Sequence, residues 1–215
     1  SLIGGRKGVY SVVALIFTFV CIVFLFLPLI YRGVSPVWAA VLVAILTTVV
    51  TMYLLGGISS KSVTAVVGTV LGVGISGILA ILFGKWTHIS GYNVADIEQL
   101  TYVGQTTNIK IGELLYAGIL ISALGAVMDV AMSIASTINE IHFRNPLLSA
   151  RELFFSGIRV GKDMMGTMSN TLILAFTGTS INTLVFLYVY NYSTTQIINM
   201  YSIGIELIQG IASTM

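Results

Sequence analysis

Long apolar stretches separated by short polar ones set the pattern of this chain. Five of them approach or exceed the roughly 20 predominantly apolar residues that a helix needs to cross a bilayer. They occupy positions 9–30, 37–55, 63–83, 111–138 and 164–189. This pattern predicts an all-α fold, a polytopic transmembrane helix bundle with five spans and with six as the alternative.

Amphipathic stretches lie between and after the predicted spans. In the loop after the third span, Asn93 and Asp96 resemble an N-cap with an acidic first turn and predict a short helix over 93–103. Before the fifth span, 149–152 has the Ser-x-x-Glu spacing of a capping box, followed by an apolar stripe that predicts a helix on the inner membrane surface. Polar residues recur at helical spacing within 196–215, so we expect an amphipathic helix on the outer surface or packed on the bundle, with a partial span as the alternative.

Composition narrows the class of protein. Of the 215 residues, 56% are hydrophobic and 8% are charged, and the mean hydropathy is +0.98. A soluble domain carries about 25% charged residues. The composition therefore excludes a soluble enzyme, an exported disulfide scaffold and a disordered regulator. A net charge of +2 does not argue for nucleic acid as a partner, whereas the apolar spans require a lipid bilayer.

The basic residues predict the orientation in the membrane. Seven of the ten fall on one side of the predicted bundle: Arg6, Lys7, Lys61, Arg144, Arg151, Arg159 and Lys162. The other three are Arg32, Lys85 and Lys110. The positive-inside rule places the side with seven cations, and with it the lead-in 1–8, in the cytoplasm.

Small residues recur at every fourth position of the third span. They are Gly68, Gly72, Ser76, Ala80 and Gly84. Because lipid gives no hydrophobic drive between helices, such a stripe favours close helix packing. A thinned helix that hinges or lines a path is the alternative.

Asp129 is the strongest candidate for chemistry. A charged carboxylate inside a span costs about 2.5–3.5 kcal/mol on insertion scales, and intramembrane acids are usually functional. Ser133 shares its helix face, and the fifth span has a polar face with Asp163, Thr167 and Asn170. These five residues predict a polar site between the fourth and fifth spans that binds a proton, a cation or a small solute, with the Asn170 amide hydrogen-bonded to Asp129. An interhelical hydrogen-bond clamp that serves only assembly is the alternative, and Asp163 also fits a helix-start carboxylate beside Lys162.

Catalytic and metal-binding patterns are weak. His88 and His142 lie in separate loops without a second histidine at three- or four-residue spacing, and Cys21 is the single cysteine and lies in an apolar run. No glycine-rich phosphate loop is followed by Lys, and no Ser or Thr has a base at recognisable spacing. We therefore expect no metal, no cofactor and no enzymatic activity, with a hydrolase at the membrane face as the weakest alternative.

Two long runs resemble a known family. Residues 125–136 (GAVMDVAMSIAS) and 161–175 (GKDMMGTMSNTLILA) are similar to the signature of the YibE/F-like family of bacterial multi-spanning membrane proteins, and 5–8 (GRKG) fits its long members. The resemblance covers essentially the whole chain. It implies the bacterial cytoplasmic membrane and a permease-like role.

The resemblance also bears on the ends of the chain and on the site. It implies an N-terminal anchor and an extracytoplasmic domain before this region and a further apolar span after it. A start at Ser1 and an end at Met215 without a charged tail agree with a segment of a longer protein. Carried over by motif, the site residues are Asp129, Ser133, Asp163, Thr167 and Asn170.

Two functions from different classes follow from these observations. The first is a transporter or permease component with a proton- or cation-linked solute site. The second is a membrane scaffold without transport activity, acting as a homo-oligomer or with a partner membrane protein through its small-residue grooves.

Overall fold

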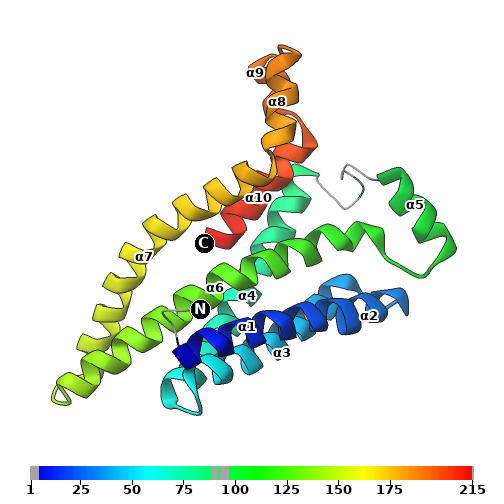
Figure 1. The fold of residues 1–215 in the computed structure, drawn as a ribbon. Helices are drawn as coiled ribbons and strands as arrows, with labels where there is room; N and C mark the ends of the chain where they lie inside the picture. The colour runs from blue at the N-terminus through cyan, green and yellow to red at the C-terminus, as the bar shows by residue number, and fades with distance from the viewer. Residues whose placement is uncertain (1–4, 89–91, 93–96, 215) are drawn as a thin grey trace.

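The described part of the chain is built from helices. The computed structural model describes residues 5–88, 92 and 97–214, and these contain no strand (Figure 1). The first half comprises α1 (Gly5–Cys21), a π-helical turn (Ile22–Phe26), α2 (Leu27–Tyr31), α3 (Pro36–Gly56), α4 (Ser60–Thr87) and α5 (Ile97–Thr106). The second half comprises α6 (Ile111–Arg144), α7 (Ala150–Thr179), α8 (Ile181–Val189), α9 (Thr194–Ile198) and α10 (Tyr201–Thr214).

Four helical stretches are long and apolar enough to cross a membrane. They are Gly8–Tyr31, Pro36–Gly56, Ser60–Leu82 and Ile111–Arg144. Their backbone groups are hydrogen-bonded within each helix, which a bilayer requires because it offers no water to satisfy them. The all-helical, multi-span fold class predicted from the apolar pattern is confirmed.

The fifth apolar stretch forms a bent pair of helices. α7 begins at Ala150, so the expected surface helix and the start of the fifth span are one continuous helix. α7 and α8 meet at a break around Ser180 with a bend of 63°, and the pair makes a fifth, broken span if both helices serve as one. The buried Ser180 hydroxyl donates a hydrogen bond to the Glu206 carboxylate of α10 at this break. The prediction of 164–189 as one unbroken helix missed the bend, which falls where 177–180 supplies only small residues.

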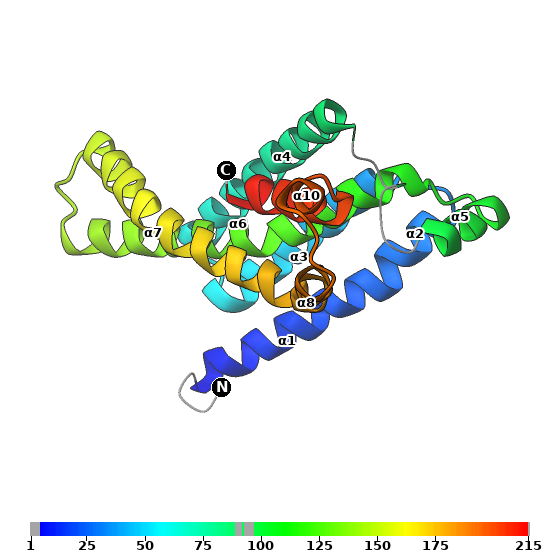
Figure 2. The same cartoon turned by 90° about the horizontal axis from the view of Figure 1, so that it is seen from above.

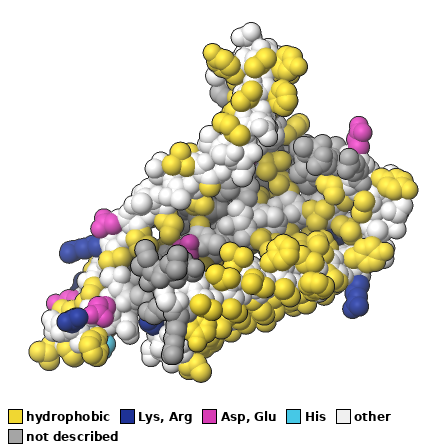
Figure 3. Space-filling model, viewed as in Figure 1, with side chains coloured by type: hydrophobic (Ala, Val, Ile, Leu, Met, Phe, Trp, Pro, Cys, Tyr) yellow, Lys and Arg dark blue, Asp and Glu magenta, His cyan; other side chains and the backbone are white. Residues whose placement is uncertain are grey.

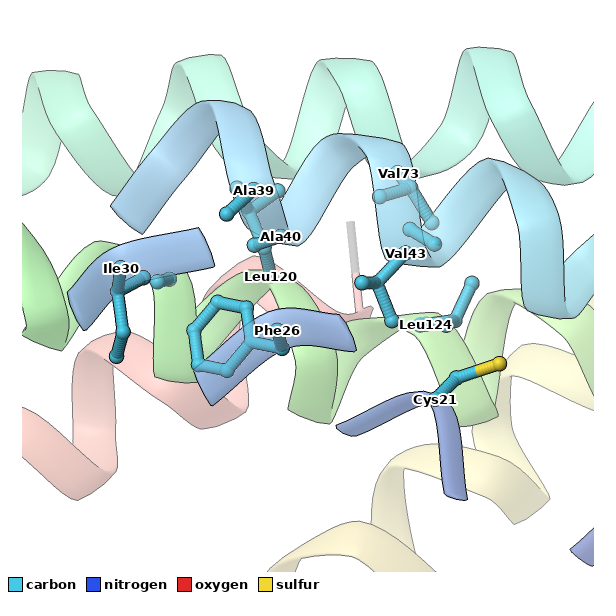
Figure 4. Packing of buried hydrophobic residues seen from close by; sticks show 11 residues of the cluster. Cys21, Phe26, Ile30, Ala39, Ala40, Val43, Val73, Leu120 and Leu124 are labelled. Carbon is cyan, nitrogen blue, oxygen red and sulfur yellow. The ribbon is translucent and has the colours of Figure 1, made fainter. Parts of the chain in front are cut away.

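α6 lies at the centre of the bundle. It packs against α3 and α4, while α1 packs on α3, and seen from above α4 and α1 lie on opposite sides of α3 and α6 (Figure 2). The main core combines Phe26 of the π-helical turn, Val43 of α3, Val73 of α4 and Leu120 of α6 (Figure 4). Cys21 is buried in the same cluster, which agrees with the packing role expected of a lone cysteine in an apolar run.

Glycines bring α4 close to α6. A Cβ atom added at Gly72 would lie 2.5 Å from Val127 Cγ1, and one at Gly77 would lie 2.6 Å from Leu120 Cδ2. Both distances are too short for real contacts, so only glycine allows the two backbones to approach this far. The close-packing interpretation of the small-residue stripe is confirmed at this contact.

The amphipathic segments form the predicted helices where the structure describes them. Ser149 and Glu152 make the expected capping box, with the Ser149 backbone amide 2.8 Å from Glu152 Oε2. α10 packs on the bundle, where Ile208 joins Ala80 of α4 and Ile119 of α6 in a second buried cluster. The short helix after the third span is α5, Ile97–Thr106; its predicted cap, Asn93 with Asp96, lies outside the described residues.

Substitution of Gly72 tests this helix contact. Because the branched Val127 side chain has little rotamer freedom in a helix, Gly72→Ala should destabilise the fold by about 1–3 kcal/mol. Gly74→Ala is the matched control, since a Cβ there meets nothing within 4 Å. It should be neutral or gain up to about 1 kcal/mol from its better helix propensity. Thermal unfolding in detergent measures both, and equal stability of the two variants would contradict the contact.

Candidate functional site

Asp129 lies on the membrane-spanning helix α6 with an exposed side chain. Within the described part of the chain, no hydrogen bond or ion pair reaches its carboxylate. The other two acids of α6 are held by partners: Ser35 donates to Glu113, and Glu140 pairs with Arg144 at 2.8 Å. Asp129 is therefore an uncompensated acid on an apolar helix.

The polar face of α7 is also exposed. Asp163, Thr167 and Asn170 all have exposed side chains. The Thr167 hydroxyl lies 3.4 Å from the Asp163 backbone carbonyl, which only closes one turn of the helix. Ser133, on α6, is half-buried, and its carbonyl accepts a hydrogen bond from Thr137 at 2.8 Å. Apart from these bonds within one helix, the side chains of the predicted site residues have no hydrogen-bond partner in the described chain. They are therefore able to bind a ligand or another segment.

The two polar faces point away from the contact between α6 and α7. This contact places Gly157 and Gly161 of α7 against Ile134 and Ile138 of α6. At about 100° per residue, Asp129 lies about 180° around α6 from Ile138. By the same count, Asn170 lies about 180° around α7 from Gly161. The described residues contain no Asp129–Asn170 hydrogen bond, and a binding site made by the five residues stays a prediction.

A groove lies between α4, α6 and α7 with a volume of about 960 Å³. Its walls are mostly apolar or small, and its charged or titratable lining residues are Lys61, His142 and Lys162. Asp129 is two residues from the lining residues Val127 and Ala131, so it lies on the far side of α6. α6 thus separates an apolar groove from an acidic face.

Three buried hydroxyls on α3 and α4 were not among the residues expected to matter from the sequence. Thr48 and Thr51 of α3 and Thr69 of α4 are buried, and none of them has a hydrogen-bond partner among the described residues. Thr47, in contrast, donates to the Val43 carbonyl at 2.7 Å. The threonine cluster in an otherwise apolar span was the available signal. It was missed because threonine in a membrane helix usually bonds to its own preceding turn.

Charged side chains gather at one end of the molecule, beside the turn between α6 and α7 (Figure 3). Glu140, Arg144, Arg151 and Glu152 are all exposed there. Apolar side chains cover much of the remaining visible face. Among the described residues, no three His, Cys, Asp or Glu side chains come together as metal ligands.

The long apolar helices and the uncompensated intramembrane acid define a multi-pass helical membrane protein. The profile of the YibE/F-like protein family matches residues 1–215, and the chain belongs to this family. No curated protein shows significant similarity to the chain. No solved structure does so either.

The buried hydroxyls can be tested by removing them one at a time. Thr69→Val should stabilise the fold by about 1 kcal/mol, because a buried hydroxyl without a partner costs about 1–3 kcal/mol. Thr47→Val, which removes a hydroxyl that is bonded, should cost about 0.5–1.5 kcal/mol. Thermal unfolding in detergent compares the two. A loss of stability with Thr69→Val would show that its hydroxyl is used, for instance by a bound water or ion.

Proposed function

We propose that the chain is the membrane part of a permease-type transporter, in which Asp129 is the proton- or cation-binding group of the solute site. The observation that carries the proposal is the exposed Asp129 carboxylate on α6, without a partner in the described chain. An ionised carboxylate against lipid is strongly unfavourable, so this group needs a proton, a cation or a polar solute to compensate it. Binding of such a species is what a coupled transporter requires of an intramembrane acid.

The polar face of α7 supports the same proposal. Thr167 and Asn170 expose hydroxyl and amide groups that both donate and accept hydrogen bonds. Such groups suit a polar solute better than lipid, because hydrocarbon leaves them unsatisfied. Ser133 and Asp163 extend the two faces by one turn each.

The contact between α6 and α7 suits a helix that shifts. Gly157 and Gly161 present backbone rather than side chains to Ile134 and Ile138. A contact with few interlocking side chains resists sliding less than ridges packed into grooves do. α7 also rises away from α6 beyond the turn, and α8 and α9 project from the rest (Figure 1). A movement of α7 would shift its polar face relative to Asp129 on α6.

The scaffold alternative depends on free small-residue grooves. Gly72 and Gly77 are already used within the chain, where they pack against Val127 and Leu120. Those two glycines therefore cannot hold a partner without opening the bundle. This observation favours transport over a scaffold built on the small-residue stripe.

Flux across a membrane tests the proposal. The protein is reconstituted into liposomes, and uptake of H⁺, Na⁺ or K⁺ is followed with an entrapped dye. Asp129→Asn should reduce the flux at least tenfold, because the amide neither ionises nor carries an exchangeable acidic proton. It should leave the thermal unfolding midpoint unchanged or raise it, since the carboxylate has no partner to lose.

The matched control is Glu140→Gln, an acid on the same helix that pairs with Arg144 at the exposed end. This variant should keep the wild-type flux within about twofold, because an exposed pair contributes about 0–1 kcal/mol. Full flux in Asp129→Asn would refute the role of this residue. No flux of any of the three cations through the wild-type protein would refute cation-linked transport and favour the scaffold.

A further inference from the structure

The groove between α4, α6 and α7 has the volume of a ligand site. At about 960 Å³, it lies at the upper end of the range of about 300–1,000 Å³ typical of ligand pockets. Gly68 and Gly72 contribute to the α4 wall, whereas apolar side chains such as Leu153 form most of the α7 wall. Apolar side chains of α6 such as Val130 form the third wall.

The basic residues of the groove lie in the half of it nearer the turn between α6 and α7. Gly72 faces Val127 and Gly68 faces Ala131, so α4 runs antiparallel to α6. Lys61 is seven residues before Gly68, which places it about 10 Å further toward the end of α6 where Asn139 and His142 also line the groove.

Lys162 lines the groove from α7, near the middle of its length. It directly follows Gly161, which contacts Ile134. None of the residues that line the groove is Asp or Glu, so the charge of its lining is positive in this half. An anion is therefore the complementary ligand.

The groove has a basic part near the membrane–water boundary, which we call its head, and an apolar part deeper in the span, which we call its body. Lys61 is the second residue of the candidate span Ser60–Leu82, so it lies at the membrane–water boundary. Gly68 and Gly72 are two to three turns further into the span. On α7, Met165, Met168 and Leu172 continue the apolar lining beyond Lys162. A cationic head at the boundary and an apolar body at hydrocarbon depth fit an amphiphile with an anionic headgroup.

We propose that this groove binds an anionic phospholipid from the leaflet on the side of the α6–α7 turn. Its phosphate lies between Lys61 and Lys162, beside His142, and an acyl chain follows the glycine-lined body of the groove along α6. Two lysine ammonium groups supply the charge that basic pockets between membrane helices offer to lipid headgroups. The apolar walls make a water-soluble anion a poor occupant, because such an anion would leave them exposed. The proposal is independent of transport, since it concerns the opposite side of α6 from Asp129.

Lipid binding to the purified protein in detergent tests this proposal. Native mass spectrometry and thermal unfolding are run with dioleoyl phosphatidylglycerol, with dioleoyl phosphatidylcholine and with glycerol 3-phosphate. Phosphatidylglycerol should bind the wild-type protein at least fivefold more tightly than phosphatidylcholine and should raise the unfolding midpoint. Glycerol 3-phosphate, which has the phosphate without the acyl chains, should do neither.

Two double variants of equal charge change locate the lipid. Lys61→Gln with Lys162→Gln should abolish the preference for phosphatidylglycerol. The control is Arg144→Gln with Arg151→Gln, which removes two exposed cations near the same turn but outside the groove, and it should keep the preference. A third variant, Val130→Trp, fills the body of the groove while keeping both lysines and should weaken binding of both lipids.

Several results would overturn the proposal. An equal loss of the phosphatidylglycerol preference in the two double variants would mean that the lipid is attracted to the positive charge of the whole surface and not to this groove. Binding of glycerol 3-phosphate as tight as that of phosphatidylglycerol would identify a soluble anion site. Loss of self-association in Val130→Trp without any change in lipid binding would make the groove an interface between copies of the chain.

Discussion

Close approach of α4 to α6 is the contact on which the rest of the fold depends. In a bilayer, apolar side chains gain little by leaving lipid for another helix, so helices are held together by tight packing and interhelical hydrogen bonds. Gly72 and Gly77 supply that packing, because they let Val127 and Leu120 fill the space that a side chain on α4 would take. With α4 seated there, α3 completes the core against both helices, and α1 packs on α3.

The central position of α6 gives its faces different environments. One face is used by α3 and α4 in the core, one lines the groove below α7, and one carries Asp129 outward. The helix is 34 residues long, more than a bilayer requires, so its end beside α7 extends toward the charged turn. The same helix therefore links a packed core, an apolar groove with a cationic half and an acidic face. The proposed functions use the groove and the acidic face, whereas the packed core stabilises the fold.

The fold and much of its local chemistry were predictable from the sequence. Four apolar spans, the capping box at Ser149 and the packing role of the glycines all follow from periodicity and residue type. The broken helix at Ser180 was not predictable, because an apolar stretch of sufficient length reads as one span whether or not it bends. At this break the Ser180 hydroxyl donates a hydrogen bond to Glu206, a residue 26 positions further along the chain.

The sequence by itself determined that this is an all-helical, multi-pass membrane protein with an acid inside its fourth span. It does so because hydrophobic length and helical period are local properties of the chain. Only the tertiary structure decided which way the polar residues face: Asp129 and Asn170 both point away from the contact between their helices. It alone brought Lys61 of α4 and Lys162 of α7 to one groove. Such relations depend on how helices rotate and cross, which is set by side-chain packing between segments far apart in the sequence.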